Sequence, residues 1–144
     1  MTHPVLFEKV AIGDELPPLE IAITRTLIVA GAIASRDYQN VHHDIACAQA
    51  QGMSDIFMNI LTTNGLVGRY LTDWAGPNCT LRNIAIKLGA PNFPGDSMHL
   101  TGSVSSSTPE CEGGVVEVHI RGANSLGIHV TGVASIKLPG EIHS

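Results

Sequence analysis

Two carboxylates and two imidazoles fall within ten residues of the sequence, in the stretch "SRDYQNVHHD" at positions 35–44. Within it, Asp37 and His42 lie five positions apart, close enough for their side chains to converge on one water molecule. A carboxylate beside an imidazole forms an acid/base pair that can work near neutral pH, because histidine titrates in that range. The spacing therefore allows proton-transfer chemistry on a bound substrate.

Two other interpretations of the same stretch stay open from the residues alone. His42, His43 and Asp44 are all metal-ligand types, which would suit a metal site. Adjacent histidines in a loop point in different directions, however, and no HExxH-like pair at helical spacing accompanies them, so we expect no metal. The second alternative is a surface loop in which Asp44 caps the next helix and the histidines face solvent.

Short elements on either side must position this loop. The segment "LEIAIT", residues 19–24, places Leu19, Ile21 and Ile23 on one face, which predicts a short half-buried strand. Thr24 can cap an apolar helix over residues 25–35 that runs straight into the loop. Asp44 is placed to cap a brief helix, "IACAQAQ", which Gly52 would end.

A longer apolar segment, residues 54–74, predicts a buried central helix that begins at a cap on Ser54 or Asp55. Two glycines inside it, Gly65 and Gly68, weaken a helix and are expected to let another backbone come close. The apolar side chains at helical spacing are Ile56, Phe57, Ile60, Leu61, Val67 and Leu71.

Beyond "AGPN" the apolar period changes to two, which predicts consecutive strands at about 83–88, 98–104, 116–120 and 128–138. The turns "PNFPGD", "TPECEGG" and "ANSLG" separate these runs. An antiparallel sheet with one apolar face, and one apolar helix to cover it, indicates the α+β class. On this pattern His99, His119 and His129 fall on the polar face and are expected to be exposed.

The composition excludes several kinds of partner. The charged fraction is 15%, the net charge is −5 and the isoelectric point is about 5.7, so we expect no nucleic-acid partner. The sequence has neither a leader pattern nor an apolar run long enough to span a membrane, and we expect a cytoplasmic protein. At 144 residues the chain is expected to form one domain over residues 1–144.

Three cysteines, Cys47, Cys79 and Cys111, are widely spaced and contain no CxxC pair. This argues against a disulfide framework and against a cysteine zinc site. We expect reduced thiols in or near the core.

The segment "DYQNVHHD" resembles the D-x-N-P-[LIV]-H-x-D motif of the MaoC-like, or type 2, enoyl-CoA hydratases. The positions that match in register are Asp37, Val41, His42 and Asp44. Three positions depart from the pattern: Gln39 replaces an asparagine, Asn40 a proline, and Arg36 a glycine that commonly precedes the aspartate. Because proline stiffens a loop, its loss leaves the loop less fixed by the chain itself.

The resemblance extends along most of the chain. "IGDELP" and "PGDS" resemble recurrent turns of the family. The segments "DIFMNIL", "GLVGRYLTDWAGP" and "NSLGIHVT" are similar to those of the small subunits of actinobacterial heteromeric hydratases that act on steroid side-chain enoyl-CoA thioesters.

The resemblance implies a hot dog fold, an antiparallel sheet wrapped around one central helix, and hydration of a trans-2-enoyl-CoA. It implies that Asp37 and His42 are the catalytic pair and that the backbone N–H of Asn59, where the family has glycine, stabilises the enolate oxygen. No cofactor is expected, since the substrate itself carries coenzyme A. Asp44 is expected to support the loop.

The family pairs its domains side by side, so the resemblance also implies a partner. This would be a second MaoC-like subunit, giving a heterotetramer, or a second copy of the chain, giving a homodimer. Two other functions stay open: a hot dog thioesterase, for which the central helix offers only Asp55 and Asp73, and a non-catalytic subunit. The intact pair Asp37 and His42 argues against both.

Overall fold

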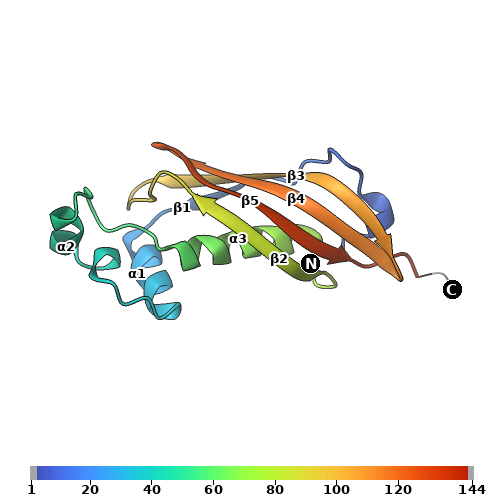
Figure 1. The fold of residues 1–144 in the computed structure, drawn as a ribbon, viewed down its shortest axis with the longest axis horizontal. Helices are drawn as coiled ribbons and strands as arrows, with labels where there is room; N and C mark the ends of the chain where they lie inside the picture. The colour runs from blue at the N-terminus through green and yellow to red at the C-terminus, as the bar shows by residue number, and fades with distance from the viewer. Residues whose placement is uncertain (1–2, 143–144) are drawn as a thin grey trace.

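The structure, a computed structural model, describes residues 3–142 of the 144. The elements form one antiparallel sheet with a long helix across one face and two short helices beside one end (Figure 1). The helices and strands, in chain order, are η1 Phe7–Lys9, β1 Leu19–Ala22, α1 Arg25–Ala34, η2 Asn40–His42, α2 Ile45–Ala50, α3 Ile60–Ala75, β2 Thr80–Leu88, β3 Ser97–Glu110, β4 Gly113–Asn124 and β5 Gly127–Leu138.

The five strands are ordered β1-β3-β4-β5-β2, and every neighbouring pair is antiparallel. The three longest strands, β3 to β5, follow one another through two tight turns, at residues 111–112 and 125–126. The first of these turns corrects the expected loop "TPECEGG", because β3 continues through Pro109 to Glu110. The turn itself is closed by Glu112 and Gly113, both with positive φ.

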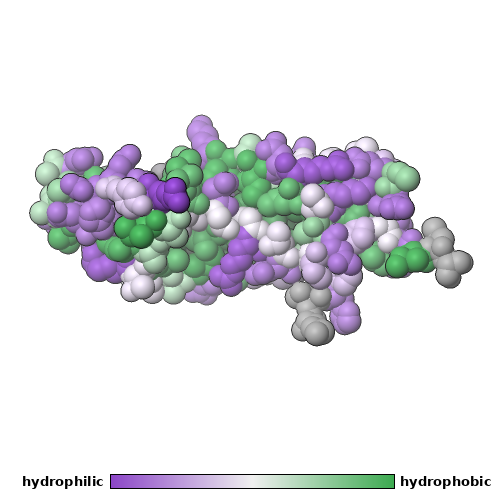
Figure 2. Space-filling view, turned by 90° about the horizontal axis from the view of Figure 1, so that it is seen from below, coloured by the Kyte–Doolittle hydropathy of each residue, from purple (hydrophilic) through white to green (hydrophobic). Residues whose placement is uncertain are grey.

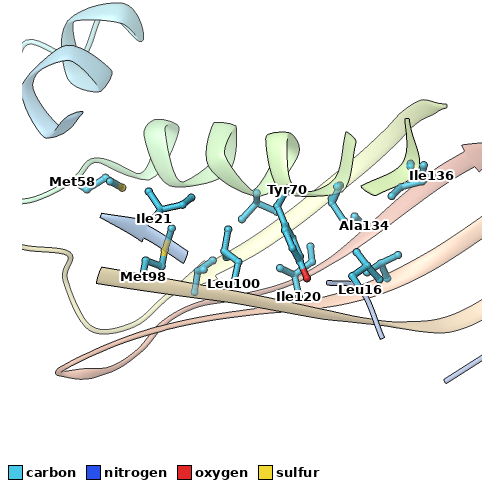
Figure 3. Close-up of a cluster of buried hydrophobic side chains, with 14 of the residues drawn as sticks. Leu16, Ile21, Met58, Tyr70, Met98, Leu100, Ile120, Ala134 and Ile136 are labelled. Atoms are coloured by element: carbon cyan, nitrogen blue, oxygen red, sulfur yellow. The ribbon is translucent and has the colours of Figure 1, made fainter. Parts of the chain in front are cut away.

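The predicted apolar alternation is confirmed along most of the sheet. In β3 and β4, alternate side chains are buried under α3, where Tyr70 extends from the helix to the strands beside Leu16 and Ile120 (Figure 3). The buried apolar side chains of these two strands are Met98, Leu100, Val104, Val116, Val118 and Ile120. The α+β class and the sheet-around-helix arrangement expected from the sequence are therefore confirmed.

The start of the central helix was predicted wrongly. It begins at Ile60, with Asn59 as its N-cap, and not at Ser54 or Asp55. Asp55 is engaged elsewhere, since it accepts two hydrogen bonds from the guanidinium of Arg25 and one from the N–H of Ile56. Residues 54–59 form a non-helical segment that is tied to the sheet end by Met58 N donating to Asn92 O at 3.1 Å.

The buried face of α3 is accordingly shorter than predicted. Ile56 is buried, but from the segment before the helix, whereas Ile60 and Leu61 are about half exposed. Gly68 faces side chains of β2, and Gly65 faces open space. The prediction that these glycines let another backbone come close is therefore wrong within the described residues. The residues of α3 that are buried are Thr63, Val67, Tyr70, Leu71 and Ala75.

Both short helices begin as predicted. The Thr24 hydroxyl accepts from Leu27 N at 3.0 Å and begins α1. The Asp44 carboxylate accepts from Ala46 N and Cys47 N and begins α2. Gly52, with φ of +87°, follows the end of α2 as expected.

All three cysteines are free thiols. Cys47 and Cys79 are half-buried free thiols, whereas Cys111 is exposed in the β3–β4 turn and so lies outside the core. Among residues 3–142, no helix has the length and hydropathy that crossing a membrane requires.

Candidate active site

The loop that carries Asp37 begins at the end of α1 with an unusual backbone conformation. Arg36 has φ of +56°, in the left-handed region that glycine adopts without strain. The chain then turns back so that Asp37 N donates to Ala32 O at 2.9 Å. This conformation explains why glycine suits the position before the aspartate, and Arg36 occupies it here with some strain.

Backbone hydrogen bonds fix the middle of the loop, where the proline of the motif is missing. The carbonyl of Asn40 accepts from His43 N at 3.0 Å and from Asp44 N at 2.7 Å, and His42 N donates to Gln39 O at 3.2 Å. These bonds close the single turn η2 and lead directly into the Asp44 cap of α2. The loop is thus held within the chain, without the proline whose absence was expected to loosen it.

The side chains of Asp37 and His42 meet, as their spacing allows. His42 Nε2 lies 3.3 Å from Asp37 Oδ2, and the imidazole is buried. On the other side of the ring, Nδ1 lies 2.7 Å from Phe57 O. A carbonyl can only accept, so Nδ1 carries a proton, and in the neutral ring Nε2 has the free lone pair that faces Asp37.

The orientation of His42 depends on the non-helical segment before α3, because that segment leaves Phe57 O free to accept from the imidazole. Phe57 O would accept an intrahelical hydrogen bond if the helix began at residue 54, and it could not then hold the imidazole in the same way. The Phe57 ring also packs against the imidazole edge, with ring centroids 5.0 Å apart. The late start of α3 is therefore part of the construction of the site.

The carboxylate of Asp37 is held mainly by the amide of Asn59. Asn59 Nδ2 donates to Asp37 Oδ2 at 3.0 Å, and Gln39 N donates to Oδ1 at a longer 3.3 Å. The hydrogen bond from Asn59 is the main cause that lowers the pKa of Asp37 below its ordinary value. Burial opposes it, and Gln39 N–H and His42 add smaller effects in the lowering direction. Asp37 is thereby kept ionised at neutral pH.

A cavity of about 430 Å³ adjoins the pair. Its walls come from the Asp37 loop, the segment before α3, and the end of the sheet near Leu88 and His129. Asn59 and Ile60 also line it, so the cavity reaches the N-terminus of α3. Asp44 and His43 are not among its lining residues: Asp44 caps α2 as expected, and its backbone hydrogen bonds lower its pKa, while His43 is exposed.

His129 lines this cavity and is buried, although the sequence pattern predicted an exposed side chain. Only 1% exposed, it directs Nδ1 to Ala90 O at 2.6 Å, and its Nε2 lies 2.8 Å from the Thr63 hydroxyl. Burial lowers the pKa of His129, so the neutral ring accepts from Thr63 and donates to Ala90.

An irregularity in β5 explains the error. Gly122 pairs with Val130 and Ala123 with Ile128, so His129 is an extra residue in the ladder. The bulge turns His129 inward beside buried Val130 and leaves Ile128 exposed, the reverse of strict alternation. Only the glycine before it, Gly127, hinted at irregular backbone in the sequence.

Several other charged residues and histidines lie away from this cavity. Arg82 pairs with Glu110, Arg69 pairs with Asp73 at the exposed surface of α3, and His99 and His119 are exposed as expected. A larger, open hollow of about 950 Å³ lies on the outer face of the sheet, among residues such as Lys87 and Arg121. It contains neither Asp37 nor His42, whereas both of these residues line the smaller cavity. Within residues 3–142, no three His, Cys, Asp or Glu side chains are grouped to hold a metal ion.

Comparison with known proteins gives one curated relative and several structural neighbours. No model of a known protein family matches the chain. The chain is 42% identical over 127 residues to the 3-oxo-4,17-pregnadiene-20-carboxyl-CoA hydratase beta subunit of Mycobacterium tuberculosis, covering 88% of this chain and 95% of the relative.

Solved structures agree with this relative. A chain of the ChsH1-ChsH2 complex from Mycobacterium tuberculosis superimposes with a TM-score of 0.83 at 41% identity, over 89% of this chain and 98% of that one. The R-hydratase PhaJ1 from Pseudomonas aeruginosa gives a TM-score of 0.86 at 20% identity, over 96% and 88% of the two chains, which supports the fold alone.

Proposed function

The chain belongs to the MaoC-like enoyl-CoA hydratases, and we propose that it is the subunit that carries the acid/base residues of a hydratase for steroid side-chain enoyl-CoA thioesters. The observation that carries this proposal is the approach of His42 Nε2 to Asp37 Oδ2, 3.3 Å, at the wall of a cavity. A non-catalytic subunit would have no need of this pair.

In the proposed reaction, one water molecule in the cavity forms hydrogen bonds with both side chains. His42 Nε2, which bears the lone pair, takes a proton from the water, and the carboxylate of Asp37 accepts a hydrogen bond from its other hydrogen. The water oxygen bonds to the β carbon while the electrons of the C=C bond move toward the thioester oxygen. The proton on His42 then passes to the α carbon, which completes the 3-hydroxyacyl thioester and restores the neutral imidazole.

The negative charge that develops on the thioester oxygen requires hydrogen-bond donors. The backbone N–H of Asn59, at the start of α3, donates to no other group within the described residues 3–142 and belongs to a residue that lines the cavity. A helix N-terminus favours negative charge, and one such donor contributes about 3 kcal/mol to the transition state. The donor role of Asn59 N–H thus remains part of our proposal.

A steroid substrate is proposed from the relative, whose name specifies a pregnadiene-carboxyl-CoA. The cavity of this chain borders apolar side chains at its outer end, where Ile60 is 48% exposed. An apolar ring system could lie against this end and against a partner chain, with the enoyl group reaching the pair. We propose no cofactor, since the substrate itself carries coenzyme A.

A second subunit is proposed because the structurally similar chain was solved in a two-protein complex. In this chain the face that bears α3 has apolar surface exposed (Figure 2), and the edge strand β2 is paired on one side only. Ile60, Leu61 and the open space over Gly65 lie at this face. We propose that a second MaoC-like chain covers it in a cytoplasmic heterotetramer built from single hot dog domains, and that self-pairing is the alternative.

The test is a substrate comparison with two preparations: the chain alone, and the chain with a second MaoC-like subunit from the same genome. Loss of the enoyl thioester absorbance is followed for a steroid side-chain 2-enoyl-CoA and for a straight-chain 2-enoyl-CoA. We expect hydration of the steroid thioester by the two-subunit preparation. Hydration of neither substrate would overturn the proposal. Release of free coenzyme A would indicate a thioesterase, although Asp55 and Asp73 are bound to Arg25 and Arg69, away from the cavity.

A further inference from the structure

The orientation of the Asn59 side chain is fixed by its own hydrogen bonds. Its Oδ1 accepts from Thr62 N at 3.0 Å, as the N-cap of α3, and also from the Thr62 hydroxyl. An NH2 group cannot accept a hydrogen bond, so the amide cannot be turned the other way round. Nδ2 must therefore face the Asp37 loop.

Both hydrogens of Nδ2 have partners there. One is Asp37 Oδ2 and the other is Ser35 Oγ, each at 3.0 Å. The Ser35 hydroxyl uses its own proton toward the end of α1, at Gly31 O, 2.7 Å away, which leaves a lone pair for Asn59. The amide is 2% exposed, so every polar atom of this side chain is satisfied inside the protein.

This network places one side chain between two elements that are far apart in sequence. Asn59 ends the segment that holds His42 through Phe57 O, and its amide reaches the carboxylate that faces His42 Nε2. The Asp37 oxygen that receives the amide is the same one that approaches the imidazole. The position of the carboxylate relative to His42 therefore depends on Asn59, in a loop where Arg36 is strained.

We propose that the Asn59 side chain is a positioning residue of the reaction, which aims the Asp37 carboxylate at the water site, separately from any role of the Asn59 backbone N–H. The inference rests on the proposed hydratase function, because it assigns a task within that reaction. Asn59 would combine three tasks: helix cap, carboxylate support and backbone donor.

Asn59→Gly separates these tasks. Glycine keeps the backbone N–H and is a tolerated N-cap, but it removes the amide from Asp37. We expect kcat to fall by about 10- to 100-fold with little change in KM, because misplacement of a catalytic group slows the chemical step more than it weakens binding. Loss of the amide also removes the main cause of the lowered pKa of Asp37, so the titration of this carboxyl moves to higher pH.

Two further variants guard against a folding defect. Asn59→Ser keeps a strong N-cap but cannot reach Asp37, and we expect it to behave as Asn59→Gly does. Asn78→Gly, at an exposed position in the turn after α3, is the matched control and is expected to keep the wild-type profile. All three are compared with the wild type by circular dichroism before assay.

The titration of the Asp37 carboxyl, followed by carbon-13 NMR in the free chain, gives a readout that needs no substrate. Wild-type rates in Asn59→Gly, or an unchanged Asp37 titration, would overturn the positioning role and leave the hydratase function intact. If the wild-type preparation hydrates no enoyl-CoA, the proposed function fails, and the NMR titration still decides whether Asn59 controls Asp37.

Discussion

At the scale of single residues, the backbone of Arg36 is strained in the loop that carries Asp37 and His42. Its φ of +56° is a conformation in which a Cβ atom is crowded, and it immediately precedes Asp37. Strain of this kind persists where the surrounding structure imposes it, here through the bond from Asp37 N to Ala32 O.

The strain at Arg36 leads to a stability prediction. Arg36→Gly should raise the free energy of unfolding by about 1 kcal/mol, because glycine relieves the left-handed strain by more than it gains in unfolded-state entropy. Arg36→Ala keeps a Cβ and is the matched control, for which we expect no such gain. Urea denaturation of both variants measures the difference; equal stability of the two would show that the backbone strain at this position is negligible.

His129 leads to a prediction about pH. Burial lowers its pKa in the folded chain below the ordinary 6.5, so the unfolded chain binds the proton more tightly. The contribution of His129 to stability is therefore complete above about pH 6.5 and is lost as the pH falls below it. We expect the free energy of unfolding of the wild type to fall between pH 7 and pH 5 more steeply than that of His129→Asn, which keeps an amide donor for Ala90.

The matched control for this prediction is His119→Asn on the exposed face of the sheet, which should keep the wild-type slope. Denaturant titrations at several pH values provide the measurement. If His129→Asn and the wild type lost stability in parallel, the buried neutral imidazole would not be the cause.

What the sequence could predict at this scale was local. Asp37 and His42 are five residues apart in one loop, and Thr24 and Asp44 cap the helices that directly follow them, so spacing and residue type suffice. The contact between Asn59 and Asp37 spans 22 residues, and no periodicity encodes it. His129 was missed because a bulge breaks the two-residue alternation on which its exposure was predicted.

At the scale of elements, α3 differs most from expectation. The hydrophobic pattern continues unbroken from residue 56 to residue 75, so nothing in it marks the change from extended chain to helix at Asn59. Tertiary hydrogen bonds decide where the helix begins. The Asp55 carboxylate accepts from Arg25, Met58 N donates to Asn92 O, and Phe57 O accepts from His42. The late start puts the N-cap Asn59 and the first helical residue, Ile60, at the wall of the cavity.

Two leucines of α3 test the corrected boundaries. Leu71 is fully buried between helix and sheet, whereas Leu61, ten residues earlier, is 50% exposed. Leu71→Ala should lower the free energy of unfolding of the isolated chain by about 2–5 kcal/mol, and Leu61→Ala by less than about 1 kcal/mol. Denaturation of the chain without a partner is the measurement. A large loss for Leu61→Ala would restore the longer buried stripe that the sequence pattern predicted.

At the scale of the whole molecule, apolar surface is exposed on the face that bears α3 (Figure 2). The sheet wraps one helix (Figure 1), and β2 is an edge strand. Ile60 and Leu61, at the start of the helix, are about half exposed. An open edge strand and exposed apolar side chains favour association. The fold class followed from the sequence pattern, but the proposed covering of this face by a second chain could be expected only from the family resemblance.

The proposed interface gives a prediction for assembly. Leu61→Asp should leave the isolated chain folded, since the side chain of Leu61 is half exposed. It should weaken binding of the second subunit by at least about tenfold, because a charge would be buried at the interface. Sedimentation of the mixed subunits measures this. Ile12→Asp is the control, because Ile12 is exposed beside the middle of β3, away from α3. If both variants bound the second subunit equally well, α3 would not be part of the interface.

The central claim is that Asp37 and His42 catalyse the hydration of an enoyl-CoA thioester. The most direct test measures kcat/KM for hydration by the two-subunit enzyme that carries both Asp37→Asn and His42→Ala. We predict that kcat/KM for hydration falls by at least about 10²- to 10⁴-fold in the double variant. His43→Gln, the exposed neighbour, is predicted to keep the wild-type value. Full hydration activity in the double variant, with the fold verified by circular dichroism, would contradict the claim.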